Sequence, residues 1–208
     1  MKLYDAMTPN SLRVNVFLAE KGIEVAREKI DVMQGGTRTP AFLAKNSLGE
    51  LPVLELDDGR ILTESVAICR YFEALHPKPS LLGEDAVKAA MVEMWNRRIE
   101  FHIFGPIGDM GRHTLAFFAD RLEQIPAYAA SQKPLFAENW AWLDPEMCDR
   151  RPFIAGEAFT IADITGMAAI FVSDITGTPP PGGCDHAGAW AERMRARESF
   201  ASLRQKAV

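Results

Sequence analysis

The sequence has few of the features that mark metal-binding, nucleic-acid-binding or membrane-spanning proteins. Its three cysteines, Cys69, Cys148 and Cys184, lie far apart with no CxxC pair, which argues against a disulfide scaffold or a zinc site. There is no run of Lys or Arg and the net charge is −5, so nucleic acid is a poor partner. No segment approaches the roughly 20 apolar residues that cross a bilayer, and the first ten residues do not resemble a signal peptide. We therefore expect a cytoplasmic protein with no metal, nucleic-acid or membrane partner.

The composition does provide enough apolar side chains for a folded core. Hydrophobic residues make up 48% of the chain and charged residues 25%, close to the average of globular proteins. A chain of 208 residues fits one large domain or two small ones. The change in pattern along the chain, from mixed to helical, favours two unequal halves.

The first half alternates strand and helix signals. A strand is expected at residues 2–5, a helix at 11–21 that ends at Gly22, and a second strand at 26–32. Pro40 opens a short helix at 41–45. Two apolar runs within 51–63 are joined by Asp58 and Gly59, a strong hairpin signal, and a helix at 64–75 ends before Pro77. The predicted order is βαβ, short α, ββα.

The second half is predicted to be helical. Helices are expected at 84–102, with a stripe of mixed character formed by Val87, Met91, Met94, Arg98 and Phe101, and at 112–123, 126–147, 160–172 and 189–204. Pro106 should kink the segment after the first of these helices, and Pro134 should interrupt the third. Thr160 and Asp163 form a capping-box variant, which predicts a buried helix after them.

The order of elements in the first half is thioredoxin-like, which places the reactive position in the turn between the first strand and the first helix. A thiol oxidoreductase carries cysteine there, beside a helix N-terminus that favours the thiolate. This turn has Thr8, Asn10 and Ser11 instead. These side chains can donate hydrogen bonds to a thiolate that a ligand brings. Alternatively, they are ordinary helix caps.

Several longer strings resemble bacterial glutathione transferases with a theta-, zeta- or nu-like N-terminal motif. They are MKLY (1–4), TPNSLRV (8–14), FLAEKG (17–22), NSLGELPVL (46–54), LTESVAI (62–68) and FTIAD (159–163). The resemblance covers nearly the whole chain in the expected order. It implies an α/β thioredoxin-like domain at 1–77 that binds glutathione, a linker at 78–83, and an all-α domain at 84–208 that forms the electrophile pocket. It also implies a homodimer.

The resemblance assigns glutathione contacts to two segments. It implies that Pro52 is cis, that the backbone of Leu51 pairs with the cysteinyl part of glutathione, and that Glu64 and Ser65 hold its γ-glutamyl end. A carboxylate suits the ligand ammonium, and a hydroxyl with N–H groups at a helix start suits the α-carboxylate. Glu50 stands where many relatives carry an amide or a base.

The resemblance leaves the sulfur contact as a ranked set of Thr8, Ser11 and Asn10. Theta- and zeta-like relatives place a serine at the position of Thr8, and bacterial relatives with the same string use the Thr and the Asn together. Beta-like relatives carry cysteine at the position of Asn10, so a mixed disulfide with glutathione is not expected here. Tyr4 lies inside the first strand and is not placed for this role.

The resemblance suggests a second-substrate pocket on the loop and on the first helix of the helical half. Its candidate residues are Met7, Trp95, Arg98, Phe101, His102 and Ile107. Most of them could equally be core or dimer contacts. The expected function is a glutathione S-transferase whose thiolate attacks a small hydrophobic electrophile, with glutathione as co-substrate. A glutathione-dependent disulfide or peroxide reductase and a non-catalytic binding module are the alternatives.

Overall fold

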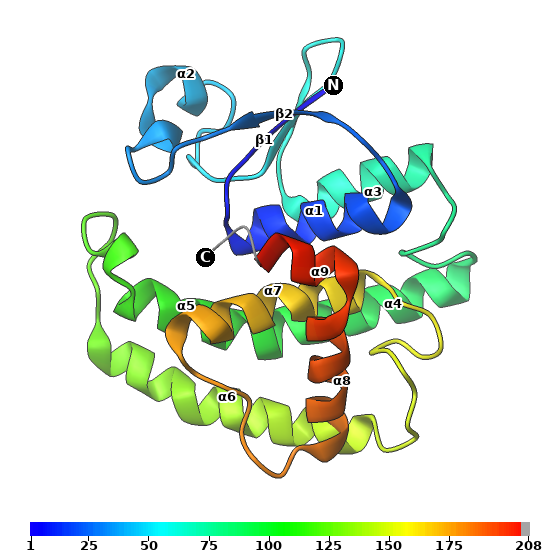
Figure 1. Ribbon diagram of the computed structural model, residues 1–208. Coiled ribbons are helices and arrows are strands. Elements are labelled where there is room, and N and C mark those ends of the chain that lie inside the picture. Colours follow the sequence, from blue (N-terminus) through cyan, green and yellow to red (C-terminus); the bar gives the residue numbers. More distant parts are fainter. Residues whose placement is uncertain (205–208) are drawn as a thin grey trace. The chain divides into compact units, whose positions relative to one another are not determined.

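The computed structural model describes residues 1–204. It divides into two compact units, one of residues Met1–Ser80 and one that begins at Leu81 (Figure 1). They are named here the N-terminal unit and the helical unit. Among the described residues, all four named strands belong to the N-terminal unit. No helix within this range is both long enough and apolar enough to cross a membrane.

The N-terminal unit is built on a mixed four-stranded sheet. Its strands are β1 (Lys2–Asp5), β2 (Ala26–Lys29), β3 (Val53–Glu55) and β4 (Ile61–Leu62), in the order β2-β1-β3-β4. The pair β1 and β2 is parallel, and the other two pairs are antiparallel. The hairpin predicted around Asp58 and Gly59 is confirmed as β3 and β4. The second strand is shorter than predicted, since it ends at Lys29.

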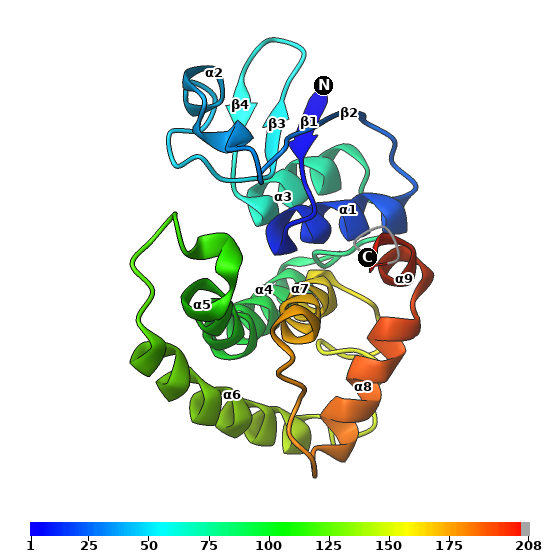
Figure 2. The same ribbon diagram turned by 60° about the vertical axis from the view of Figure 1, so that its left-hand side comes forward.

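The two faces of this sheet are covered by different helices. Tyr4 and Val53 pack with Phe42 of α2 (Pro40–Leu43), which follows the 3-10 turn η1 (Gly36–Arg38). Successive side chains of a strand point to opposite faces, so Leu3 and Leu54, both fully buried, point to the other face. Figure 2 shows α1 (Pro9–Lys21) and α3 (Ser65–Leu75) side by side on that face.

The first helix ends where predicted, at Lys21 before Gly22, but it begins at Pro9, two residues before the predicted start at Ser11. The extended residue Thr8 caps α1, Pro9 takes the first helical position, and Gly22 ends the helix in the left-handed conformation with φ 63°. Residues 8–11 are therefore the N-cap and the first turn of α1, shortly after β1, and are hereafter called the 8–11 turn.

The helical unit is organised around one buried helix. Residues 161–173 of α7 (Ile161–Thr176) are all buried, and α7 packs against α4, α5 and α8 (Figure 2). The helices of this unit are α4 (Ala86–Ile99), the π-helical η2 (Glu100–Phe104), α5 (Gly105–Thr114), η3 (Ala116–Phe118), α6 (Pro126–Glu146), α7, α8 (Asp185–Ala196) and α9 (Glu198–Arg204).

The start of α7 is held by a buried carboxylate. Asp163 accepts hydrogen bonds from the Thr160 N–H and the Ile154 N–H, both at 2.9 Å, and from the Trp190 indole N–H at 2.9 Å. The predicted capping box is confirmed, since the Thr160 side chain and the Asp163 side chain each bond the other's backbone N–H. Gly166 lets the Trp190 ring approach, because a Cβ there would lie 2.3 Å from a ring carbon.

Two predicted helix boundaries and one predicted helix interruption in this unit were wrong. The helix expected at 112–123 ends at Thr114, and the closing helix is divided at Arg197. Pro134 does not interrupt α6, which is continuous. Pro134 and Ala130 are both exposed, so the carbonyl that loses its helical partner can bond water, which lowers the cost of the proline. Pro106, which was expected to kink this segment, lies in the first turn of α5, directly after the π-helical segment η2.

Candidate functional site

The 8–11 turn presents a hydroxyl group beside the N-terminus of α1. The Thr8 Oγ1 accepts a hydrogen bond from the Ser11 N–H at 3.3 Å. Because the oxygen accepts in this cap, the Thr8 O–H remains able to donate to an anion. The helix N-terminus carries a partial positive charge that also favours an anion. Thr8 can therefore cap α1 and bind an anion at the same time.

Ser11 and Asn10 differ in accessibility. Asn10 is half-buried, whereas Ser11 is fully buried, and its Oγ has no hydrogen-bond partner among the described residues. A buried hydroxyl without a partner costs about 1–3 kcal/mol, which an acceptor on a ligand would offset. The Ser11 hydroxyl could therefore donate a hydrogen bond to a ligand atom that reaches the 8–11 turn.

Glu64 has an unusual backbone at the start of α3. Its φ is 64° and its ψ is 114°, a conformation that L residues rarely adopt and that costs on the order of 1–3 kcal/mol. The Glu64 side chain is exposed and does not cap the helix. The first N–H groups of α3 are therefore not satisfied by a residue at the N-cap. Such a helix start is suited to a carboxylate ligand.

Arg13 supports Ser65 and was missed in the sequence analysis. Arg13 lies on α1 with 2% exposure, and its Nη1 donates to the Ser65 Oγ at 2.9 Å. Since a guanidinium has no acceptor, Ser65 must accept this bond, which leaves its own O–H to donate. The bond joins the start of α1 to the start of α3. The available signal was a charged residue between buried apolar neighbours, Leu12 and Val14.

The remaining glutathione-binding candidates lie just before β3. The Leu51–Pro52 peptide bond is cis, as the resemblance implied. Leu51 and Pro52 are buried, whereas Glu50 is exposed. The Asn46 amide donates to the Glu50 carbonyl at 2.9 Å, which fixes the backbone of this loop. A second cis bond, Lys78–Pro79, was not predicted.

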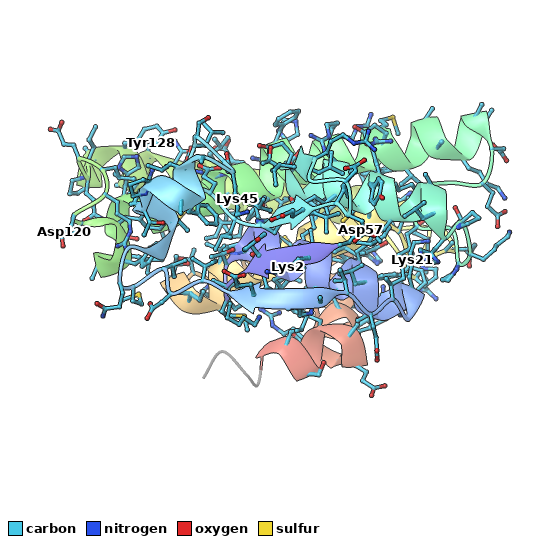
Figure 3. All side chains as sticks on the ribbon, turned by 90° about the horizontal axis from the view of Figure 1, so that it is seen from above. Lys2, Lys21, Lys45, Asp57, Asp120 and Tyr128 are labelled. Carbon is cyan, nitrogen blue, oxygen red and sulfur yellow. The ribbon has the colours of Figure 1, made fainter. Side chains whose placement is uncertain are left out.

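Two other side chains of the N-terminal unit that could act as nucleophiles, those of Cys69 and Tyr4, are buried. Cys69 is fully buried, and burial raises the pKa of its thiol to about 12. Tyr4 donates its hydroxyl to Glu55 at 2.6 Å. Lys45, labelled in Figure 3, pairs with Glu55 at 2.7 Å and lies over the Tyr4 ring at 4.8 Å. Neither residue offers a free nucleophile at the 8–11 turn.

The six electrophile-pocket candidates have very different environments. Trp95 and Ile107 are buried, at 4% and 0% exposure, and are core residues of the helical unit. Phe101 is 65% exposed and Met7 is 38% exposed. Arg98 and His102 line a common cleft.

This cleft lies within the helical unit, between α4, η2 and α6, and is hereafter the α4–α6 cleft. Its volume is about 370 Å³, and it is lined by Arg98, His102, Asn139, Trp142 and Glu146. The last three follow one another at i, i+3 and i+7 on α6, so they share a helix face. No local pattern in the sequence places them beside Arg98 and His102, because that contact depends on how the helices pack.

Comparisons with known proteins decide the family. The family described as "Glutathione S-transferase, N-terminal domain" matches residues 8–75. Glutathione S-transferase 2 of Saccharomyces cerevisiae is 32% identical over 98% of this chain and 89% of its own length. The chain belongs to the glutathione S-transferase family.

Solved structures agree with this assignment. A glutathione S-transferase domain-containing protein of Marinobacter aquaeolei VT8 is 37% identical, with a TM-score of 0.89 over 96% of this chain and 100% of its own. Human glutathione transferase theta-2, solved in complex with glutathione and an unknown ligand, is 25% identical, with a TM-score of 0.85 over 99% and 85% of the two chains. The thioredoxin-like sheet followed by helices, predicted from the sequence, is confirmed as the architecture of this glutathione S-transferase.

The region that matches the family begins at the proposed sulfur contact and contains the proposed γ-glutamyl contact. It starts at Thr8 and runs through α3, so it includes Arg13, Glu64 and Ser65. As a member of this family, the chain is a transferase. The roles of its individual side chains belong to the proposal that follows.

Proposed function

We propose that this glutathione S-transferase activates the thiol of glutathione at the 8–11 turn and directs the thiolate at a small hydrophobic electrophile. Glutathione acts as co-substrate, bound by a domain of residues 1–77. A second domain of residues 84–208, of which 205–208 lie outside the described residues, supplies most of the second-substrate pocket. The observation that carries this proposal is the Thr8 cap, whose hydroxyl remains able to donate while it closes α1. The human theta-2 relative that was solved with glutathione supports the choice of ligand.

The catalytic requirement is a thiolate at neutral pH. A free thiol titrates near 8.5, and a pKa lower by two units requires about 2.7 kcal/mol of preference for the anion. A hydrogen bond to a charged group contributes about 1.5–3 kcal/mol, and a helix N-terminus about 0.3–1 kcal/mol. The Thr8 hydroxyl with the α1 N-terminus is therefore sufficient, and Ser11 and Asn10 are the next candidates.

The γ-glutamyl end of glutathione is proposed to lie at the start of α3. Its α-carboxylate would accept from the Ser65 hydroxyl, which Arg13 orients, and from the uncapped N–H groups of the helix. Its ammonium would pair with the exposed carboxylate of Glu64. The strained backbone of Glu64 supports this role, because such strain is concentrated at binding and active sites. The backbone of Leu51, beside the cis Pro52, would receive the cysteinyl part, and Glu50 is a further contact in this proposal.

The second-substrate pocket keeps its six candidates, Met7, Trp95, Arg98, Phe101, His102 and Ile107. Conjugation of chlorodinitrobenzene tests transfer to an electrophile, and turnover of hydroxyethyl disulfide tests reduction. Glutathione-dependent conjugation is the expected activity. Retention of glutathione without turnover of either substrate would contradict the transferase mechanism.

We expect the substitution Glu64→Gln to weaken glutathione binding by about tenfold to a hundredfold, because a hydrogen bond between charged groups is worth about 1.5–3 kcal/mol. The thiol pKa of bound glutathione should not change, since Glu64 contacts the opposite end of the ligand. Isothermal titration calorimetry measures the affinity. Glu24→Gln, which neutralises another exposed acid of the same unit, is the matched control. A normal dissociation constant for Glu64→Gln would refute the γ-glutamyl assignment.

We also propose that the chain forms a homodimer through the stripe of mixed character that runs along α4 into η2. The residues Val87, Met91, Met94, Arg98 and Phe101 follow one another at intervals of four and three, as in a helix-pairing seam. Val87 is 73% exposed and Met91 is 45% exposed, whereas the opposite face of α4 is buried. Exposed apolar side chains in a line on one helix are typical of a protein interface.

The double substitution Val87→Asp with Met91→Asp is expected to dissociate this dimer, because two carboxylates would be buried without partners. Light scattering after size exclusion should then give the chain mass of 23.1 kDa instead of twice that value. Ile175→Asp, at a 51% exposed position of α7, serves as control and should remain dimeric. Equal masses for wild type, double variant and control would contradict the interface.

A further inference from the structure

The last residue of β1 carries a buried carboxylate close to the 8–11 turn. Asp5 is 0% exposed and stands three positions before Thr8 in the sequence. Figure 2 shows β1 leading into the start of α1. A charge that is removed from water is costly unless it is paired and hydrogen-bonded. The groups that pair with Asp5 therefore help to fix the backbone that enters the turn.

Two cations of the neighbouring strand face this carboxylate. Lys29 lies opposite Asp5 in the parallel register of β1 and β2, and Arg27 lies two residues before Lys29, so all three side chains share one face of the sheet. The Arg27 guanidinium donates to the Asp5 Oδ2 at 3.0 Å. The Lys29 ammonium lies 2.8 Å from the Asp5 Oδ1. These contacts join the end of β1 to β2.

An amide on α1 completes the group. Asn15 is 8% exposed, and its Nδ2 donates to the Asp5 Oδ2 at 3.1 Å while its Oδ1 accepts from the Arg27 guanidinium. Asn15 comes four residues after Ser11, so the two lie on one face of the helix. Asp5, Asn15, Arg27 and Lys29 are hereafter the Asp5 network. The network joins the segment before the 8–11 turn to the segment after it.

We propose that Asp5 is a positioning residue for thiolate activation, because its network holds both ends of the 8–11 turn. This inference rests on the function proposed for that turn. Apolar side chains often stabilise a buried position as well as an ion pair does, so stability alone does not account for a carboxylate there. Hydrogen bonds are directional, and those of Asp5 orient the segments that they join. A displacement of about 1 Å can lower a reaction rate about a hundredfold.

Hydrogen exchange on the full chain without glutathione tests this role. The N–H groups of Thr8 and Leu12 each donate to a nearby carbonyl at 2.8 Å, so their exchange rates report opening of the turn. Asp5→Asn should raise both rates about tenfold, as expected from the loss of one hydrogen bond to a charged group. The Ile68 N–H, which is bonded at 3.0 Å at the start of α3, should keep its rate.

A matched control lies on the same two strands. Glu28 pairs with Lys2 at 3.1 Å on the other face of the sheet, so Glu28→Gln also changes an acid to its amide but leaves the Asp5 network intact. It should not alter exchange in the 8–11 turn. Asn15→Ala is the second variant if Asp5→Asn does not fold, and it should speed exchange in the turn in the same way.

Two results of this experiment would overturn the proposal. One is unchanged exchange of Thr8 and Leu12 in the variants of the network. The other is an equal increase at Ile68, because Asp5 would then stabilise the whole unit and have no particular effect on the turn. Neither result depends on glutathione.

The thiol pKa of bound glutathione gives the functional readout. Loss of a nearby anion would by itself lower this pKa, whereas displacement of the Thr8 hydroxyl raises it. We expect Asp5→Asn to raise it by about one unit, with the affinity for glutathione unchanged. If the wild-type value is lowered, an equal or lower value in Asp5→Asn would overturn the proposal. If the wild-type thiol titrates like free glutathione, the thiolate mechanism fails, and hydrogen exchange still decides whether Asp5 fixes the turn.

Discussion

Asp163→Ala is expected to destabilise the folded protein by about 3–6 kcal/mol. The Asp163 side chain is fully buried and accepts hydrogen bonds from two backbone N–H groups and the Trp190 indole. Each of these donors would remain buried without an acceptor, at a cost of about 1–3 kcal/mol each. The same change removes the capping box of α7, the central helix of its unit. Urea unfolding measures the loss.

A matched acid lies at the other end of the same helix. Asp174 pairs with Arg195 at 2.8 Å and is partly exposed. Asp174→Ala should cost about 1 kcal/mol or less, as exposed ion pairs do. If Asp163→Ala and Asp174→Ala lowered the free energy of unfolding by the same small amount, the hydrogen bonds of Asp163 would not stabilise the helical unit as described.

The second large effect is expected at the 8–11 turn. Thr8→Val should raise the thiol pKa of bound glutathione by about 1–2 units, because it removes one hydrogen bond worth about 1.5–3 kcal/mol to the anion. The catalytic efficiency at neutral pH should fall roughly threefold to twenty-fivefold, in proportion to the lost thiolate. The thiolate absorbance and the conjugation rate are the measurements.

Thr8→Ser separates the hydroxyl from the shape of the side chain. It keeps the O–H and the helix cap, so it should retain most of the activity. Ser11→Ala is the competing test, since Ser11 is the second candidate donor. If Ser11→Ala lost activity while Thr8→Val kept a normal thiol pKa, Ser11 and not Thr8 would be the main hydrogen-bond donor to the sulfur. Asn10→Ala should have a smaller effect than either.

Local signals in the sequence were sufficient to predict most of the N-terminal unit. Thr8 and Gly22 mark the two ends of α1 because a cap and a left-handed glycine act within one helical turn. Asp58 and Gly59 specify the hairpin for a similar reason, since the turn itself sets the pairing of β3 and β4. The capping box of α7 is also a contact between near neighbours.

Features that depend on packing between distant segments were not predicted. The bond from Arg13 to Ser65 joins residues 52 positions apart, and nothing near Arg13 in the sequence identifies its partner. The α4–α6 cleft depends on Asn139 meeting the carbonyl of His102, which is 37 positions away. The strained backbone of Glu64 likewise has no signal in the sequence, because glutamate is not a residue that favours positive φ.

In the proposed mechanism, the 8–11 turn stabilises the thiolate form of bound glutathione at neutral pH. Titration of the thiolate absorbance of glutathione bound to the wild-type chain tests it most directly. The proposed donors predict an apparent pKa about two units below the value near 8.5 of a free thiol. A bound thiol that titrates at the same pH as free glutathione would contradict the mechanism, whatever the affinity of the complex.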